Sequence, residues 1–598
     1  METTEVIICG CGPTGAMLAS QLGRLGVNNI CVDKEDGITT DPRGIALDED
    51  GIRALQSAGI YEHIYRDIGQ CMGLFKFVGG VHTDLNHPPF LTMDYTTSKG
   101  GTGHVGFICH KQPHLENTFA DRSLRRRVIS EDDEWVYATY RTADGSERTI
   151  RGRFLVGADG KTGFTRKKYL EPKGILMTHF SQSSYEETWV APGYSPEDVF
   201  NLFFPPNFRF LCNPHRPAVC GRFGTPAERL WRFEFVVRPG EDGNELATPA
   251  KLKEILYPYL THPGTCYGLQ TEVAYPLDCV KTLRSRPFFF SARTCNKWSL
   301  ERVILSGDSA HVFPPFGGQG LASGFRDACS LAWRLKVACQ SGFKPYERLF
   351  EGWYKERKDQ LDKSLAATIE NGRYVTEGNP FKILFRDTYL WMVQPIPWWK
   401  RELEKGARRH GMCRYQYDPG MHFICQLDGG LLLPQVYCSP LDITTSTKPG
   451  ECISFTDDEI FSPTKQGLFQ LVAVVNSSGE FPGAYEELQK IERYSNHYIV
   501  VSEATVVVMD PQAKSSAVAA ARYRTVRVAT ADEFAMSPLC KNRPPPKYYD
   551  EYRIAAGVPG SKYIIVRPDR FVFAACRTRD GLVYALGQME SVLHGKTM

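Results

Sequence analysis

The sequence lacks any apolar run of about twenty residues, the length that a helix needs to cross a bilayer. It also lacks a marked excess of one charge, since 71 Lys and Arg against 68 Asp and Glu give a formal net charge of +3. This near-neutral balance gives no reason to expect nucleic acid or an acidic membrane surface as a partner. The opening METTEVIICG contains neither a basic segment nor a cleavable apolar one. Together these absences predict a cytoplasmic protein with no membrane span.

No CxxC pair occurs among the 18 cysteines, which are scattered from Cys9 to Cys576. The one close pair, Cys9 and Cys11, lies in the first predicted strand and the turn after it. A tetrahedral metal site would need two further ligands close to that pair. We therefore expect buried, reduced thiols and no metal site.

The chain has 598 residues, too many for one hydrophobic core, so we expect roughly three or four domains. Apolar residues make up 42% of the sequence and charged residues 23%, as in ordinary globular proteins.

An apolar run, a GxGxxG turn at residues 10–15, a helical pattern and a second strand follow one another at the N-terminus. In such a unit Gly10 makes the tight turn, Gly12 lets a pyrophosphate approach the backbone, and Gly15 lets the helix pack on the sheet. Asp33, at the end of the second strand, is placed to accept hydrogen bonds from a ribose. Because this carboxylate would repel a 2′-phosphate, the unit favours FAD or NAD over NADPH.

Two further predicted strands also end in a carboxylate. Residues 154–156 lead into Gly-Ala-Asp-Gly with Asp159, and residues 303–305 lead into Gly-Asp with Asp308. Beyond Asp308 the segment SGDSAHVFPPFGGQGLASGFRDACSLAWRL (residues 306–335) passes through two prolines and a GGQG turn into a helix. This arrangement directs backbone N–H groups at a helix N-terminus toward an electron-rich ligand.

Together, GCGPTG, GADG and GDSAHxxPPxGGQG resemble the motifs of the single-component FAD-dependent aromatic hydroxylases, in particular the phenol hydroxylase and 3-(3-hydroxyphenyl)propionate hydroxylase branch. The resemblance spans about residues 5–357. It implies that the first motif holds the ADP half of a non-covalent FAD and that Asp308 meets the ribityl chain. It also implies that Asp159 contacts both FAD and NAD(P)H. The loop expected along the isoalloxazine contains Pro315, Gly318, Gly320 and Leu321.

The segments PRGIAL (residues 42–47) and KQPHLE (residues 111–116) resemble further family positions, which implies that Arg43 and Gln112 lie against the flavin. Arg43 is the residue that we expect to affect turnover most directly.

Pro315 and His311 are the other catalytic candidates, although the motif position of His311 favours a role in shaping the loop. No substrate-activating base is identified from the sequence. The chain departs from the family pattern at Gly163, where serine is usual, and at Ala322 and Ser330, where asparagine is usual. These departures concern the details of flavin binding.

The resemblance implies an α/β fold: a Rossmann-like FAD-binding domain with an inserted antiparallel-sheet substrate domain and a thioredoxin-like C-terminal domain. Period-two alternation within residues 208–235 supports the antiparallel sheet. The expected boundaries are residues 1–184 and 291–424 for the FAD-binding domain with its covering helices, 185–290 for the substrate sheet and 425–598 for the C-terminal domain.

In the C-terminal domain we expect strands at residues 429–435, 468–475, 498–501 and 563–569. Because this domain has no CxxC, we expect a structural or dimer-forming role, and the sequence leaves a homodimer open. Before it, a Trp-rich stretch at residues 389–399 is interrupted by Pro395 and Pro397. This pattern favours a packed or lid-like segment over a membrane-surface helix.

The function implied by the resemblance is a monooxygenase that consumes NADPH or NADH. It would insert one atom of O2 into a small phenolic or polyketide-like aromatic substrate through a C4a-hydroperoxyflavin. Baeyer–Villiger insertion, epoxidation and oxidative dearomatisation by the same fold stay open, as does a non-catalytic flavin-binding scaffold. The halogenase motif WxWxIP is absent. The sequence does not specify the substrate or the choice between NADH and NADPH.

Overall fold

The computed structural model describes residues 1–35, 37–38, 44–119, 125–142, 145–179, 186–188, 197–405, 412–441, 452–514 and 522–594. Arg43 and the start of the PRGIAL segment lie outside these ranges. Among the described residues, every helix is too short or too polar to span a bilayer. All 18 cysteines are free thiols, but Cys266 and Cys279 are exposed, so the expectation of buried thiols is wrong for these two.

The first sheet has the strand order β2-β1-β10-β21-β20; in addition β9 pairs with β10, and β8 pairs with β9. Its strands are β1 (Glu2–Cys9), β2 (Asn29–Val32), β8 (Arg125–Glu131), β9 (Val136–Arg141), β10 (Glu147–Gly157), β20 (Ser299–Leu300) and β21 (Val303–Leu305). Strands β2, β1, β10 and β21 run parallel. The apolar half of β1 is fully buried, as in a parallel sheet covered on both faces.

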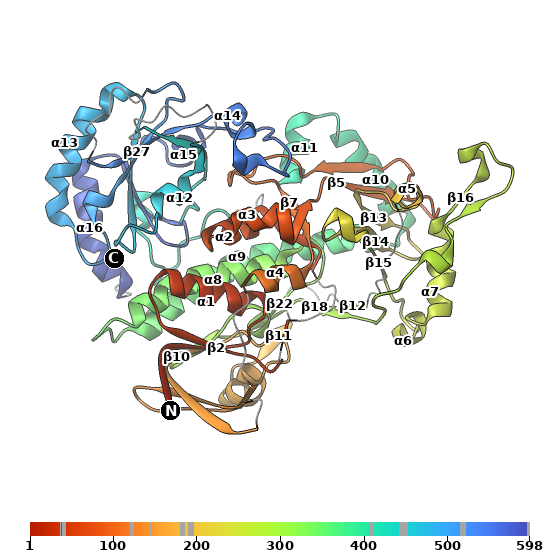
Figure 1. The fold of residues 1–598 in the computed structure, drawn as a ribbon, viewed down its shortest axis with the longest axis horizontal. Coiled ribbons are helices and arrows are strands. Elements are labelled where there is room, and N and C mark those ends of the chain that lie inside the picture. The colour runs from red at the N-terminus through yellow and green to blue at the C-terminus, as the bar shows by residue number, and fades with distance from the viewer. Residues whose placement is uncertain are drawn as a thin grey trace.

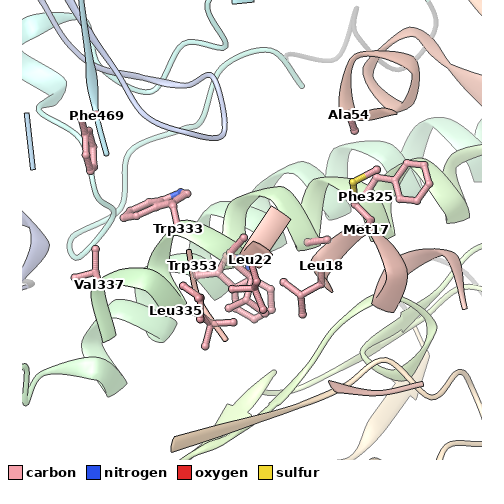
Figure 2. Packing of buried hydrophobic residues seen from close by; sticks show 14 of the residues in the cluster. Met17, Leu18, Leu22, Ala54, Phe325, Trp333, Leu335, Val337, Trp353 and Phe469 are labelled. Atoms are coloured by element: carbon pink, nitrogen blue, oxygen red, sulfur yellow. The ribbon is translucent and has the colours of Figure 1, made fainter. Parts of the chain in front are cut away.

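Two helices pack against each other beside this sheet. Helix α1 (Pro13–Arg24) contacts α8 (Gln319–Ala338), and α8 packs on the long helix α9 (Tyr346–Thr376). Leu18 and Leu22 of α1, Leu335 of α8 and Trp353 of α9 belong to one buried apolar cluster, part of which is drawn in Figure 2. The helix that follows the GxGxxG turn is therefore fixed against the helix that follows the GGQG turn.

A second sheet of five strands has the order β15-β14-β13-β5-β6. The strands are β5 (Leu74–Gly79), β6 (Leu91–Asp94), β13 (Phe208–Cys212), β14 (Ala218–Phe223) and β15 (Leu230–Phe235). The antiparallel pairing predicted within residues 208–235 is confirmed, because β13 pairs with β14 and β14 with β15 in antiparallel fashion. However, β13 pairs in parallel with β5, so the sheet also takes two strands from residues 74–94, outside the expected range 185–290.

The C-terminal part forms a seven-stranded sheet with the order β24-β23-β27-β26-β25-β28-β29. Its strands are β23 (Tyr437–Pro440), β24 (Ser454–Phe455), β25 (Gln470–Val475), β26 (Thr505–Val508), β27 (Arg524–Val528), β28 (Tyr563–Val566) and β29 (Val572–Cys576). Helices α13 (Phe481–Ile491) and α16 (Arg579–Leu593) lie beside it at one side of the molecule (Figure 1). The predicted strands at 468–475 and 563–569 are confirmed as β25 and β28.

The strands predicted at residues 429–435 and 498–501 are wrong. The first segment begins with two glycines and makes only isolated bridges, through Leu431 and Leu432. In the second, the Asn496 side chain accepts hydrogen bonds from the backbone N–H groups of Tyr498 and Ile499, which bends the chain into a turn. Both segments were misread because apolar residues can be buried in a turn as well as in a strand.

A fully buried charge network joins the C-terminal part to α8 and α9. The Arg567 guanidinium donates to both Glu356 carboxylate oxygens, at 2.9 and 2.7 Å, and also pairs with Asp569 at 2.6 Å. Arg334 donates to the same Glu356 at 2.7 Å. Removing one partner would leave an uncompensated buried charge, so this network holds the C-terminal part tightly against the helices.

Helices α10 (Pro380–Val393) and α11 (Pro397–Glu404) cover one side of the five-stranded sheet. Pro395 and Pro397 mark the boundary between the two helices. Of the expected packed or lid-like segment, the inner face is packed through Leu390 and Val393. The outer face is not packed, since Trp391 is 63% exposed and Trp398 is 59% exposed.

Candidate active site

Three loops meet at one edge of the first sheet. The last residues of the parallel strands β1, β10 and β21 are paired side by side, with Cys9 opposite Gly157 and Gly157 opposite Leu305. Each of these residues is followed by one of the predicted motifs. The carboxyl edge of a parallel sheet, where its loops gather, is the usual place for a ligand.

The glycines of the first loop differ in the space around them. A Cβ on Gly10, whose φ is +109°, would lie 2.3 Å from the Ala158 carbonyl oxygen. A Cβ on Gly15 would lie 1.9 Å from the Gly10 carbonyl oxygen. By contrast, a Cβ on Gly12 would meet nothing within 4 Å. The protein thus uses Gly10 and Gly15 for its own close packing and leaves the space beside Gly12 open, as a bound pyrophosphate requires.

Asp33 lies against the same turn. Its Oδ2 accepts a hydrogen bond from the Cys11 backbone N–H at 2.5 Å, and its Oδ1 accepts one from the Glu35 N–H at 3.0 Å. These bonds hold the carboxylate at the end of β2. Because two carboxylate oxygens offer about four acceptor sites, capacity is left for ribose hydroxyls.

Asp159 is anchored within the second loop. Its Oδ2 accepts hydrogen bonds from the Thr165 N–H and hydroxyl, both at 2.9 Å. A Cβ on Gly163 would lie 2.1 Å from Asp159 Oδ1, so glycine in place of the usual serine permits this arrangement. Nearby, the buried Arg166 donates to the Ser309 carbonyl at 3.1 Å, which ties the second loop to the third.

Asp308, in the third loop, has an exposed side chain. Nevertheless, the surrounding protein displaces water and raises the pKa of its carboxyl above the ordinary value. The carboxyl is therefore accessible to a ligand at the edge of the sheet where the three loops meet. That placement suits a hydrogen-bond acceptor for a polyhydroxyl chain.

His311 lies behind the third loop and is fully buried. Its Nε2 pairs with Asp327 Oδ2 at 2.7 Å, while Arg357 donates to Asp327 Oδ1 at 2.8 Å. The Gly307 N–H also donates to Asp327, at 3.0 Å. Although burial opposes ionisation, His311 and Arg357 lower the pKa of the Asp327 carboxyl. His311 is thus part of a buried support that fixes the backbone of the loop.

The Gln319 side chain fixes the GGQG turn to Asp48. Its amide donates to Asp48 at 2.9 Å, and Arg326 also pairs with Asp48, at 2.6 Å. Gly318 has a φ of +62°, and a Cβ there would lie 2.8 Å from Ala46 Cβ. The residues expected along the isoalloxazine, Pro315, Gly318, Gly320 and Leu321, are all half-buried, so part of their surface is available to a ligand.

Gln112, the other residue expected near the flavin, begins helix α4 (Gln112–Phe119). It is half-buried, and its amide donates to Glu116 at 2.6 Å.

Sequence reasoning missed His110, at the end of β7 (Phe107–His110). Its ring is buried, and neither ring nitrogen has a hydrogen-bond partner among the described residues. Burial, helped by the charge of Arg232, lowers the pKa of His110 to about 4, so the ring is neutral at neutral pH. A Cβ on Gly44 would lie 2.6 Å from His110 Nε2. The available signal was a histidine at a strand end directly before KQPHLE.

Arg232 of β15 was also missed. It donates to the Gly44 carbonyl at 3.0 Å and pairs with Glu234 at 2.8 Å. It therefore connects the five-stranded sheet with the loop that contains the PRGIAL segment. In the sequence, Arg232 and Glu234 stand out as charged residues in the otherwise apolar strand LWRFEF.

Comparison with known proteins agrees with this geometry. The sequence pattern of the FAD binding domain family matches residues 3–342. The 3-(3-hydroxy-phenyl)propionate/3-hydroxycinnamic acid hydroxylase of Shigella sonnei (strain Ss046) is 27% identical over 413 residues, which cover 67% of each chain. The protein of the same description from Escherichia coli (strain K12 / DH10B) is 26% identical over the same length and coverage.

Solved structures share the fold. The flavin-dependent monooxygenase PieE, in complex with FAD and substrate, has a TM-score of 0.69 at 16% identity, covering 99% of both chains. Aklavinone-11 hydroxylase, in a ternary complex with FAD and aklavinone, has a TM-score of 0.66 at 17% identity, covering 98% of this chain and 99% of that one. These likenesses show a mixed α/β fold that matches FAD-dependent hydroxylases.

Proposed function

We propose, from the fact that this chain belongs to the FAD binding domain family, that it uses NADH or NADPH and O2 to hydroxylate a phenolic or polyketide-like aromatic substrate. The resemblance expected from the three motifs is confirmed, and the chain is an enzyme of the FAD-dependent monooxygenase kind. The observation that carries the proposal is the meeting of the three motif loops at the carboxyl edge of β1, β10 and β21.

We assign the FAD contacts along that edge. The pyrophosphate would take the open space beside Gly12, the ribose would bond to Asp33, and the ribityl chain would bond to Asp308. Bound FAD supplies the redox chemistry, accepting a hydride from NADH or NADPH and activating O2. The remaining proposed contacts are Gly10, Gly15, Arg43, Gln112, Asp159, Gly318, Gly320 and Leu321.

On the substrate side, we infer that the phenolic oxygen lies near His110 and Arg232. A neutral His110 can accept a hydrogen bond from the phenol, and the neighbouring Arg232 guanidinium favours the phenolate, which is the better nucleophile. Pro315 would stiffen the loop that keeps water from the reacting atoms. His311 would position that loop through Asp327, since it is fully buried.

The expected domain division also stays part of the proposal. In it, residues 1–184 and 291–424 bind FAD, 185–290 contribute to the substrate sheet, and 425–598 form a thioredoxin-like domain with a structural or dimer-forming role. The buried charges around Glu356 support the structural role of that domain. A cytoplasmic location belongs to the same proposal.

The test is a panel of phenols and aromatic polyketides offered to the purified yellow protein with NADH or NADPH. We expect one substrate class to accelerate NAD(P)H oxidation and to yield a product that gains one oxygen atom with its ring intact. A ring-expanded product would indicate Baeyer–Villiger insertion instead. Bound FAD without substrate-stimulated oxidation across the panel would favour the non-catalytic scaffold.

A further inference from the structure

The outer faces of α10 and α11 carry large apolar side chains that no other part of the described chain covers. On α10 the inner face buries Arg386, Leu390 and Val393 against the body of the protein. The other face points into solvent. Six side chains on the two helices are between 54% and 83% exposed, and together we call them the α10–α11 apolar face: Phe381, Leu384, Phe385, Trp391, Met392 and Trp398.

Such a concentration of exposed apolar residues marks an interaction surface, because soluble proteins rarely leave contiguous apolar patches uncovered. Neither helix could cross a bilayer. A helix with one apolar face rich in Trp, Phe and Leu can instead lie in the plane of a membrane surface. Trp and Tyr favour the depth of the lipid headgroups, and Trp391, Trp398 and Tyr389 are all exposed here.

The charges around the apolar face indicate whether a second copy of this chain or a lipid surface covers it. Residues 371–405, which are all described, contain six Lys and Arg against four Asp and Glu, and the charged residues classed as exposed are Arg373, Lys382, Arg401 and Lys405. The acids in this range are Glu377, Asp387, Glu402 and Glu404, of which Glu402 pairs with Lys405 at 2.5 Å and Glu377 with Lys382 at 3.9 Å. The cations still exceed the acids by two. A second copy related by two-fold symmetry would bring the cations against one another. An anionic lipid surface would satisfy both the apolar residues and the cations.

We propose that the α10–α11 apolar face docks this protein onto the surface of an anionic lipid bilayer. The inner side of the two helices is rigidly attached to the five-stranded sheet. Gln394 donates to the Phe90 carbonyl at 2.6 Å and accepts from the Thr92 N–H at 3.0 Å, and Glu404 accepts from the Asp94 N–H at 2.8 Å. Docking therefore brings β6 and its sheet next to the lipid.

The inner surface of α10 also connects with the candidate active site. Leu390 belongs to the same apolar cluster as Phe210 of the sheet and Phe316 of the loop before GGQG. A consequence that rests on the proposed function is that an apolar aromatic substrate dissolved in the bilayer would have a short path to that sheet. The docking itself does not depend on the proposed function.

The test is flotation of the FAD-loaded full chain with vesicles of phosphatidylcholine alone or with about one-third phosphatidylserine. We expect binding to the anionic vesicles that weakens with added salt. Phe385→Ser combined with Trp391→Ser should weaken binding at least about tenfold through lost apolar burial. Lys382→Gln and Arg401→Gln should each weaken it about fivefold.

Tyr584→Ser is the matched control, because Tyr584 is 52% exposed on α16, away from α10 and α11 (Figure 1). It should bind as the wild type does. Flavin absorbance reports whether each variant keeps its fold. If the Phe385→Ser, Trp391→Ser double variant loses FAD, Trp398→Ser on α11 takes its place. Absence of flotation with anionic vesicles would overturn the proposal. So would a dimer in light scattering that the double variant dissociates, since a second copy would then cover the face.

Discussion

The open space beside Gly12 makes the effect of one substitution calculable. Gly12 has a φ of −67° and a ψ of 178°, a conformation that valine adopts without strain. Because a Cβ there meets nothing within 4 Å, Gly12→Val should change the stability of the FAD-free protein by less than about 1 kcal/mol. The valine methyl groups would, however, fill the place proposed for the pyrophosphate. We expect FAD affinity to fall at least about 100-fold, which is roughly 2.7 kcal/mol.

Urea denaturation with and without FAD measures both quantities. At a free FAD concentration of 100 times the wild-type Kd, the wild type should gain about 2.7 kcal/mol of unfolding free energy. With a 100-fold weaker affinity, the variant should gain only about 0.4 kcal/mol at the same concentration. Gly23→Val serves as the control, because Gly23 lies near the other end of α1, which Gly12 caps, and a Cβ there also meets nothing within 4 Å.

Two results would refute this reasoning. Stoichiometric FAD in purified Gly12→Val would mean that the cofactor does not approach the backbone at this turn. A loss of several kcal/mol in the FAD-free variant would mean that the space is not open. Gly15→Ala gives the contrasting case: its Cβ would lie 1.9 Å from a carbonyl oxygen, so we expect the turn itself to be disrupted.

Three other substitutions test the remaining parts of the site and its support. Asp308→Asn should lower FAD occupancy and turnover together, by about tenfold, because hydrogen bonds to a charged group contribute roughly 1.5–3 kcal/mol; unchanged flavin absorbance would contradict the ribityl contact. Arg567→Met should lower the free energy of unfolding, measured by urea denaturation, by about 3–5 kcal/mol, because Glu356 then lacks one partner in a buried network. A decrease of less than about 1 kcal/mol would show that the network is not essential for stability. The pKa of His110 is about 4 in the folded protein, below its unfolded value, so the unfolded chain binds the extra proton between about pH 6.5 and 4. Stability should therefore fall by up to roughly 3 kcal/mol as pH drops through that window, and His110→Gln should flatten this part of the Tm–pH curve; an unchanged curve would show that His110 is not the titrating group.

The meeting of the three loops could be predicted from the sequence because it follows from local rules. Each motif comes directly after a short apolar strand, and parallel neighbours bring their carboxyl ends to one edge. The paired residues Cys9, Gly157 and Leu305 confirm that expectation. Gly10, Gly12 and Gly15 also occupy the positions that the motif requires, with two packed against backbone and one left open.

The remaining features depend on contacts between distant segments. His110 lies close to Gly44 because β7 pairs with residues 46–48, whereas Arg232 reaches Gly44 only when the five-stranded sheet meets this segment. Neither residue stands in a recognised motif. The exposed outer face of α10 was misjudged for a related reason. An amphipathic pattern shows that a helix has an apolar side, but it does not show whether the rest of the chain covers that side.

The parallel pairing of β5 with β13 has a consequence for how the protein emerges from a ribosome. More than one hundred residues separate these strands, so at typical translation rates β5 would wait on the order of ten seconds for its neighbour. During that interval the strand edge that carries Phe75 and Phe77 lacks its later partner, β13. Nascent polypeptides of this protein should consequently need a chaperone most while residues 95–207 are being made.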